Sequence, residues 1–389
     1  MEKYGRVPDC AALLAQAEQQ TGLNDLGDRW LLKNLEKLIP SLNAEARLSE
    51  AGAVGAAGMI TTALSNRLRH VALVQANREI LNEQIDVAAI VIGLPRTGST
   101  MLHRMLASAP GMTGVRWFEA QNYAPFPGEE RGQPEARREA AKQILDYMLQ
   151  ILPELMSIHP MSIDQADEEV IILGQLFSST MIEATYFTPS YTAWLGQQSQ
   201  RRAYADFYQI LQAMQWQSPE RQGASWVLKT PGHLMALDTV LATFPNAKIV
   251  MTHRDPVATV PSYCSMEESL YRLGSDEIDA KTVGKYWSER LADLLNQFLE
   301  IRANAPEDRF IDVSYRAVME NPIQQGEMIL EAAGIKSSRS LKDKMSDWVE
   351  ANQREDRATH KYSLDGFGLT KADIREKFGA YLAAFSDVL

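Results

Sequence analysis

The sequence predicts an α/β fold in which a parallel sheet is flanked by helices and carries large helical additions. An apolar run at residues 87–92 ends at Gly93, and a short loop and an apolar-striped helix follow it. Apolar strand patterns return at residues 226–229 and 248–252, and each precedes another helical pattern. Alternating strands and helices are typical of a parallel sheet, and short, continuously apolar runs are typical of strands buried on both faces.

The loop after the first strand, residues 94–98, predicts an anion site. Ser99 or Thr100 opens the next helix, so a glycine-bearing loop joins a strand to a helix N-terminus. Such a loop aims several backbone N–H groups and the positive helix end at one point, which suits a phosphate-like group. The alternative interpretation is an ordinary strand-to-helix turn whose glycines only relieve backbone strain.

The spacing within this P-loop-like segment differs from that of an ATP-binding loop at one position. Gly93 and Gly98 are separated as in the pattern GxxxxGK[ST], but Ser99 stands where the phosphate-binding lysine belongs. Arg96 is the only cation of the loop. We therefore expect a nucleotide other than ATP bound in the usual way. A P-loop-type nucleotide kinase and a non-catalytic nucleotide-binding relative stay open as alternatives.

The same residues resemble the sulfotransferase family. Its loop, P-[KR]-[ST]-G-[ST]-T, grips the 5′-phosphosulfate of PAPS (3′-phosphoadenosine 5′-phosphosulfate), and PRTGST at residues 95–100 matches it at every position. The resemblance implies an enzyme that moves a sulfuryl group from PAPS to a hydroxyl or amine of a small-molecule acceptor, giving PAP, without a metal ion. It also implies that the loop residues that contact the donor are Arg96, Thr97, Gly98, Ser99 and Thr100.

The strand at residues 248–252 leads to a second pattern. Asp255 suits a helix N-cap and Pro256 the first helical position, so Arg254 lies where open α/β sheets bind ligands. Ser262 follows on the first turns of that helix. In the sulfotransferases an arginine and a serine at this spacing hold the 3′-phosphate of PAPS. The alternatives are a salt bridge between Arg254 and Asp255 and a Ser262 hydroxyl bonded to its own helix.

Sulfuryl transfer needs a cation at the leaving oxygen and a base at the acceptor. Lys229 ends a strand and, by the resemblance, is the residue that stabilises charge on the bridging oxygen. His233 and Glu119 are equally ranked candidates for the general base. A histidine suits this role because it can remove a proton near neutral pH. Glu168 and Glu169 form a third option. The alternatives are surface carboxylates and a hydrogen-bonded structural histidine.

A third motif lies near the C-terminus. Residues 360–369, HKYSLDGFGL, resemble the H-x-Y-S-L-x-x-F-G-L stretch of a bacterial branch of the sulfotransferases. The resemblance implies that this segment covers the nucleotide and that His360 and Lys361 contact it. The alternative is a docked C-terminal tail formed by Tyr362, Leu364, Phe367 and Leu369.

Composition favours a cytoplasmic enzyme. The net charge of −11 argues against nucleic acid as a partner. The first residues lack the apolar run of a signal peptide, and the weakly polar stretch at residues 51–64 is too short to span a bilayer. Cys10 and Cys264 give neither a disulfide framework nor metal-ligand spacing.

The chain is expected to contain a helical N-terminal extension, residues 1–85, and an α/β sulfotransferase domain, residues 86–389, with a helical insertion at residues 119–222. A helix at residues 45–81 is expected to be interrupted at two glycines, and a second strand is expected at residues 114–118.

The helical insertion is rich in aromatic and methionine side chains, which suit either a lipophilic acceptor pocket or a helix–helix core. We favour the core, and the sequence does not name the acceptor. The side chains concerned are Phe118, Tyr123, Phe126, Met156, Met161, Phe177, Met181, Tyr186, Phe187, Tyr191 and Trp194.

Overall fold

The computed structural model describes residues 3–153, 155–158, 160–352 and 362–389. Its centre is a five-stranded sheet with the order β2-β3-β1-β4-β5, in which every pairing is parallel. The α/β prediction is therefore confirmed. The strands are β1 (Val87–Gly93), β2 (Met112–Thr113), β3 (Ser225–Lys229), β4 (Lys248–His253) and β5 (Phe310–Ser314).

The central strand, β1, brings three chain segments to one edge of the sheet. It pairs with β3 and β4, with Val91 opposite Lys229 and Gly93 opposite Thr252. The loop after β1 and the ends of its two neighbours therefore open at the same edge. Gly93 has φ of +133°, and a Cβ there would lie 2.6 Å from the Thr252 carbonyl oxygen, so this close approach requires glycine.

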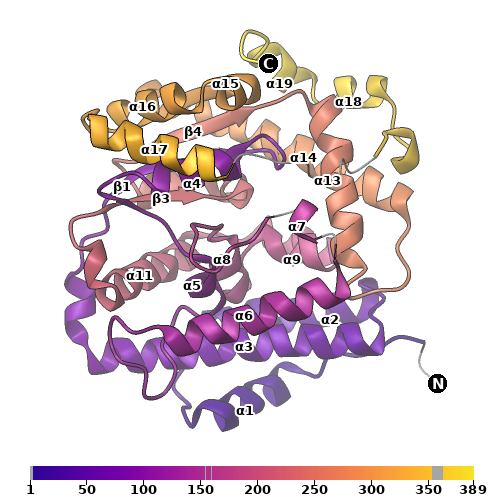
Figure 1. Cartoon of the computed structure of the whole chain (residues 1–389). Helices are drawn as coiled ribbons and strands as arrows, with labels where there is room; N and C mark the ends of the chain where they lie inside the picture. Colours follow the sequence, from indigo (N-terminus) through magenta and orange to yellow (C-terminus); the bar gives the residue numbers. More distant parts are fainter. Residues whose placement is uncertain (1–2, 154, 159, 353–361) are drawn as a thin grey trace.

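Helices cover both faces of the sheet (Figure 1). Ala89 and Val91 pack into an apolar cluster with α4 and α16, while Ile90 and Ile92 join a larger cluster that continues into α1–α3. This alternation is what the two-residue period of a strand requires. The division into an extension and a domain stays a prediction. The helices are α1 (Cys10–Thr21), α2 (Trp30–Glu45), α3 (Glu50–Ala76), α4 (Ser99–Ala107), α15 (Tyr315–Glu320), α16 (Pro322–Ala332) and α17 (Arg339–Ala351).

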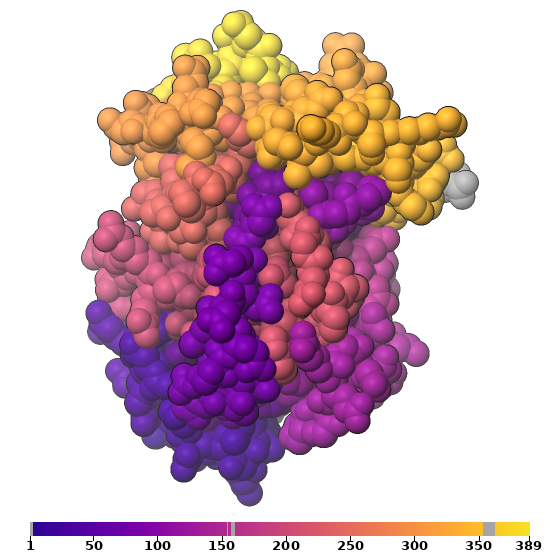
Figure 2. Space-filling view, turned by 90° about the vertical axis from the view of Figure 1, so that its left-hand side faces the viewer, coloured from indigo at the N-terminus to yellow at the C-terminus, as the bar shows by residue number. Residues whose placement is uncertain are grey.

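The remaining helices join and cover this framework. In Figure 2 the indigo N-terminal helices and the orange C-terminal helices lie at opposite ends of the molecule. Within the described part of the chain, no helix combines the length and apolar character needed to span a bilayer. These helices are α5 (Trp117–Gln121), α6 (Glu135–Ile151), α7 (Leu155–Ile158), α8 (Val170–Gln175), α9 (Thr180–Thr185), α10 (Pro189–Leu195), α11 (Arg201–Gln217), α12 (Leu237–Thr243), α13 (Pro256–Tyr271), α14 (Ala280–Arg302), α18 (Lys371–Lys377) and α19 (Gly379–Ala384). Short 3₁₀ turns include η1 (Arg78–Asn82), η2 (Pro219–Arg221), η3 (Pro231–Ala236), η4 (Glu307–Arg309) and η5 (Asp365–Phe367).

The expected interruption of the long N-terminal helix is wrong. Helix α3 runs through Gly55 and Gly58 without a break. A helical glycine costs about 1 kcal/mol relative to alanine, which tertiary packing can outweigh. Gly52 shows such packing, because a Cβ there would lie 1.9 Å from the Gly274 carbonyl oxygen.

The expected strand at residues 114–118 is also wrong. Strand β2 pairs with β3 through only two residues, Met112 and Thr113. The Glu119 carboxylate then accepts from the backbone N–H of Arg116, the N-cap residue of α5, at 2.9 Å. A carboxylate in the first turn that accepts from the N-cap N–H stabilises a helix start, so the chain becomes helical where its apolar residues suggested a strand.

Candidate active site

The loop between β1 and α4 passes through two left-handed residues. Arg96 has φ of 69° and Gly98 has φ of 80°. A Cβ at Gly98 would lie 3.2 Å from Tyr315 Cδ2, so glycine also permits close packing on the start of α15. Helix α4 begins at Ser99. Because Gly98 has no side chain, it cannot accept hydrogen bonds from the first N–H groups of α4. These N–H groups are therefore suited to bind an anion.

Thr97 fixes the shape of this loop from inside. Its hydroxyl donates to the Leu94 carbonyl oxygen at 2.7 Å and lies 2.6 Å from the hydroxyl of Thr252 on β4. The Thr97 side chain is buried. Thr97 therefore ties the loop to the sheet with its side chain, and its backbone is what it can offer to a ligand.

The structure brings Arg96, Arg254 and Ser262 together. Arg254 Nη1 donates to the Arg96 carbonyl oxygen at 2.7 Å, and Arg96 Nε donates to Ser262 Oγ at 3.2 Å. Asp255 caps α13 by accepting from the Val257 N–H, as the sequence predicts. The loop and the arginine–serine pattern thus form one cationic, hydroxyl-bearing surface.

Tyr315 is a member of this surface that the sequence analysis missed. The Arg254 guanidinium lies 4.0 Å from the centre of the Tyr315 ring. Tyr315 follows β5 directly, at the edge where β1 and β4 also end. The position of Tyr315 directly after a strand is the signal that could have identified it in the sequence. A guanidinium against an aromatic face is held in position without losing its hydrogen-bonding edge.

Two successive carboxylates bind Lys229 at the end of β3. The Lys229 ammonium pairs with Glu168 and donates to Thr100 Oγ1 at 3.0 Å. The Lys229 backbone N–H donates to Glu169 Oε2 at 3.0 Å. Lys229 is 2% exposed and the Glu168 side chain is 15% exposed. The loop, a buried lysine and a partly accessible carboxylate therefore meet at one place.

His233 lies in the same region, but both of its ring nitrogens have protein partners. Nε2 lies 2.6 Å from Glu169 Oε1, and Nδ1 lies 2.7 Å from the Tyr204 hydroxyl. The side chains of His233 and Glu169 are fully buried. Burial alone would raise the pKa of Glu169, but hydrogen bonds from His233 and from the Lys229 backbone leave that pKa lowered. This placement does not favour proton transfer between His233 and an acceptor molecule.

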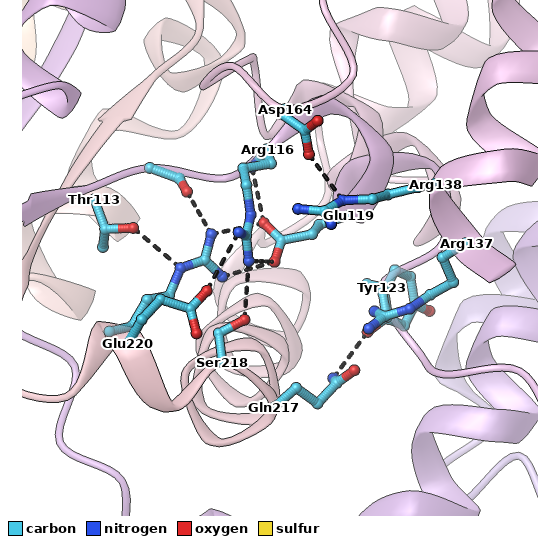
Figure 3. Close-up of polar contacts among 12 residues, drawn as sticks. Thr113, Arg116, Glu119, Tyr123, Arg137, Arg138, Asp164, Gln217, Ser218 and Glu220 are labelled. Atoms are coloured by element: carbon cyan, nitrogen blue, oxygen red, sulfur yellow. Dashed lines mark hydrogen bonds and ion pairs between the residues drawn. The ribbon is translucent and has the colours of Figure 1, made fainter. Parts of the chain in front are cut away.

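Glu119 is embedded in an arginine cluster (Figure 3). Arg221 donates to both of its carboxylate oxygens, at 2.8 and 2.7 Å, and Arg116 donates to Oε1 at 2.9 Å. Burial alone would raise the pKa of Glu119, but the charges and hydrogen bonds of Arg221 and Arg116 outweigh burial and lower the pKa to about 2. A carboxylate that binds protons so weakly is a poor base.

We predict that Glu119→Gln destabilises the fold. The lowered pKa implies that the Glu119 carboxylate contributes about 3 kcal/mol at neutral pH. The folded pKa, about 2, lies below the ordinary 4.5. The contribution is therefore complete above pH 4.5, declines as the pH falls toward 2, and is measured by urea unfolding at several pH values. Glu220→Gln is the matched control, since Glu220 also pairs with Arg116 but is 61% exposed. Equal effects of the two variants would contradict this account.

The C-terminal motif is described only in part. His360 and Lys361 lie outside the described residues, so their contact with the nucleotide stays a prediction. Phe367 and Leu369 are buried. A Cβ at Gly284 of α14 would lie 2.3 Å from the Phe367 carbonyl oxygen. Phe367, in the described part of the motif at residues 362–369, is therefore docked closely against α14.

The aromatic residues of the helical insertion lie mainly in the core. Phe118, Phe177 and Tyr191 are almost fully buried, whereas Met156 is exposed. Among the described residues there is no group of three or more histidine, cysteine, aspartate or glutamate side chains arranged to hold a metal ion.

Comparison with known proteins identifies the family. A model of the sulfotransferase family matches residues 89–339, which include the loop, Lys229 and the Arg254–Ser262 pair. The chain belongs to the sulfotransferase family. The matched segment begins inside β1 and ends at the start of α17. It therefore contains every strand of the sheet after the first two residues of β1.

Several known proteins are similar to this sulfotransferase. Omega-hydroxy-beta-dihydromenaquinone-9 sulfotransferase Stf3 of Mycobacterium bovis and of Mycobacterium tuberculosis is 26% identical over 259 residues, which are 64% of this chain and 63% of each relative. The match thus spans less than two thirds of those relatives. The crystal structure of sulfotransferase STF1 from Mycobacterium tuberculosis H37Rv is 27% identical, with a TM-score of 0.82 over 96% of this chain and 99% of that one. The structure of STF9 from Mycobacterium avium, at 23% identity and a TM-score of 0.87 over 97% of each chain, shares the fold.

Proposed function

We propose that this sulfotransferase moves a sulfuryl group from PAPS to a hydroxyl or amine of a small-molecule acceptor and releases PAP. The observation that carries the proposal is the meeting of an anion-binding loop, an arginine–serine pair and a buried lysine at one sheet edge. Arg96 contacts Ser262 across 166 residues of chain, and Lys229 contacts Thr100 across 129. Two anion-binding surfaces at one edge suit a nucleotide with phosphate groups at both ends of its ribose.

In this proposal the two surfaces bind the two ends of PAPS. Residues 96–100 hold the 5′-phosphosulfate through backbone N–H groups and hydroxyls. Arg254 and Ser262 hold the 3′-phosphate, for which a guanidinium fork and a hydroxyl supply donors. The lysine that a kinase loop uses is absent at Ser99, and Lys229 reaches the loop from the neighbouring strand instead.

Lys229 stabilises the leaving group. The acceptor oxygen or nitrogen attacks sulfur in line, the bond between sulfur and the bridging oxygen breaks, and negative charge collects on the phosphate of PAP. The Lys229 ammonium is positioned to meet that charge, because it lies beside Thr100 at the start of α4. Fixed charges that meet a developing charge stabilise the transition state more than the ground state.

Glu168 is the general base in this proposal, in place of His233 and Glu119. Among the candidate bases, Glu168 is the carboxylate that is partly accessible, and it pairs with Lys229. Glu119 is fixed between two arginines, and both nitrogens of His233 have protein partners. The proton of the acceptor hydroxyl passes to Glu168 as the bond to sulfur forms.

The acceptor proposed here is an apolar alcohol. The name of the Stf3 relatives describes a terminal hydroxyl on a menaquinone, which is an apolar molecule. The net charge of −11 opposes a polyanionic acceptor. A cytoplasmic location stays a prediction, as does the absence of nucleic acid and metal partners.

Arg254→Ala is expected to weaken adenosine 3′,5′-bisphosphate binding at least tenfold and to leave AMP binding within about threefold. Loss of a charge-assisted hydrogen bond costs about 1.5–3 kcal/mol, and AMP lacks the 3′-phosphate. Calorimetric titration in EDTA measures both affinities, with ATP and ADP, with and without Mg²⁺, as further ligands.

Arg316→Ala is the matched control for Arg254, since the Arg316 side chain is 83% exposed on α15. Equal losses for the bisphosphate and AMP would show that Arg254 does not read the 3′-phosphate. Tight, Mg²⁺-dependent binding of ATP without binding of the bisphosphate would favour the kinase alternative.

A further inference from the structure

A buried chain of hydrogen bonds runs from α11 to the end of β3. The Tyr204 hydroxyl contacts His233 Nδ1, His233 Nε2 contacts Glu169 Oε1, and Glu169 Oε2 accepts from the Lys229 backbone N–H. All four residues are at most 2% exposed. Buried polar chains of this kind persist only where each member is satisfied, because one unpaired buried group costs more than one hydrogen bond contributes.

The partners assign the proton positions within this chain. Burial raises the pKa of Tyr204 well above its ordinary value, so the hydroxyl keeps its proton and donates to His233 Nδ1. His233 Nε2 then carries the ring proton and donates to Glu169. With Nδ1 accepting and Nε2 donating to protein atoms, the ring has no nitrogen left for an acceptor molecule.

The chain acts on Lys229 through adjacent residues. Glu169 holds the backbone of Lys229, while Glu168, the residue before it, holds the ammonium of the same lysine. A shift of Glu169 therefore moves Glu168 relative to Lys229. Glu169 is the N-cap position of α8, and without His233 its buried carboxylate would lose the hydrogen-bond partner of Oε1. Displacements of about 1 Å in a positioned group can cost about 10²-fold in rate.

We propose that His233, supported by Tyr204, is a positioning residue that fixes Glu169 and thereby aligns Glu168 with Lys229. This inference rests on the proposed function for the roles of Glu168 and Lys229. His233 transfers no proton to or from the acceptor. Histidine suits this position because its Nε2–H reaches Glu169 from the turn η3 while its Nδ1 accepts from the Tyr204 hydroxyl.

The test compares two amides at position 233. In His233→Gln the side-chain nitrogen can occupy the place of Nε2 and donate to Glu169, whereas in His233→Asn it stops near the place of Nδ1. We expect His233→Gln to keep kcat within about fivefold of the unchanged chain and His233→Asn to lower it at least 30-fold. Both should keep bisphosphate affinity within threefold. The loss in His233→Asn should be larger with an aliphatic alcohol than with an acidic phenol, because the misplaced residue, Glu168, is the proposed base. Tyr204→Phe should lower kcat by less than His233→Asn.

Exchange of the Lys229 backbone N–H with solvent gives a second readout that needs no turnover. Exchange should accelerate at least tenfold in His233→Asn and change little in His233→Gln. The comparison is made between variants whose unfolding midpoints match. Equal, alcohol-selective loss of kcat in both variants would make His233 the base and overturn the proposal. Unchanged kcat and exchange in His233→Asn would also overturn it. If the unchanged chain transfers nothing from PAPS, the proposed function fails, and the exchange result alone decides whether His233 fixes Glu169 on Lys229.

Discussion

Replacing Lys229 by alanine is expected to lower kcat for sulfuryl transfer by about 10²–10³-fold, the usual effect of removing a donor that meets transition-state charge. The Lys229 ammonium is buried at the end of β3 and already donates to Thr100 of the loop. In the proposed mechanism its interaction with the leaving oxygen strengthens as charge develops there, so the loss should appear in rate more than in affinity. Steady-state kinetics with PAPS and calorimetry with adenosine 3′,5′-bisphosphate measure the two effects.

Lys248→Ala is the control for this variant. Lys248 begins β4, so it lies at the edge of the sheet opposite the end of β3, and it pairs with Asp308. It should keep both kcat and affinity. A Lys229→Ala chain that loses bisphosphate affinity and retains kcat would show that Lys229 binds the donor without acting on the transition state.

Replacing Glu168 by glutamine is expected to slow transfer to an aliphatic alcohol by about 10²–10⁴-fold, the usual contribution of a general base. An acidic phenol that is already ionised needs no base, so its transfer rate should fall far less. Glutamine has nearly the shape of glutamate, which keeps the packing beside Lys229 and removes the charge. The measurement is the ratio of kcat/KM for the two acceptors, with both proteins at saturating PAPS.

Asp164→Asn removes a carboxylate from the same segment of chain and serves as the control, since the Asp164 side chain is 60% exposed and pairs with Arg138. The ratio of kcat/KM for the two acceptors in Asp164→Asn should equal that of the unchanged chain. Equal losses with both acceptors in Glu168→Gln would remove Glu168 from the role of base.

The sequence correctly predicted that three distant segments meet at one edge of the sheet, for a simple reason. Gly93, Arg254 and Lys229 each lie at or just after the end of an apolar strand. Parallel strands end at one edge of a sheet, so three local patterns predicted one three-dimensional site. The contact of Arg254 with the Arg96 carbonyl oxygen, across 158 residues of chain, follows from that geometry.

The sequence could not distinguish among the candidate bases, because they differ in burial and in hydrogen-bond partners, which are tertiary properties. His233 and Glu119 are ordinary ionisable residues near expected strand ends. Their environments depend on Tyr204 in α11 and on Arg221 in η2, both distant from any motif. No local pattern marks either partner. The carboxylate that remained accessible, Glu168, ranked last because its distance from Lys229 is a tertiary property.

The two local errors of secondary structure have the same origin. Gly55 and Gly58 looked like breaks because glycine disfavours a helix, yet α3 is kept intact by packing along its length. Residues 114–118 have the apolar character of a strand, but β2 meets only the first part of β3, and Arg116 with Glu119 starts a helix immediately afterwards. Both outcomes depend on neighbours that local propensity does not include.

Transfer of a labelled sulfuryl group from PAPS in the presence of EDTA tests the central claim most directly. The acceptors are an acidic phenol and a long-chain aliphatic alcohol, and sulfated product and PAP are counted together. We expect one PAP per sulfated acceptor without added metal, and at least a tenfold lower kcat/KM for PAPS in the Arg254→Ala chain. Absence of sulfated product from PAPS, together with Mg²⁺-dependent transfer of phosphate from ATP to an acceptor, would contradict the account.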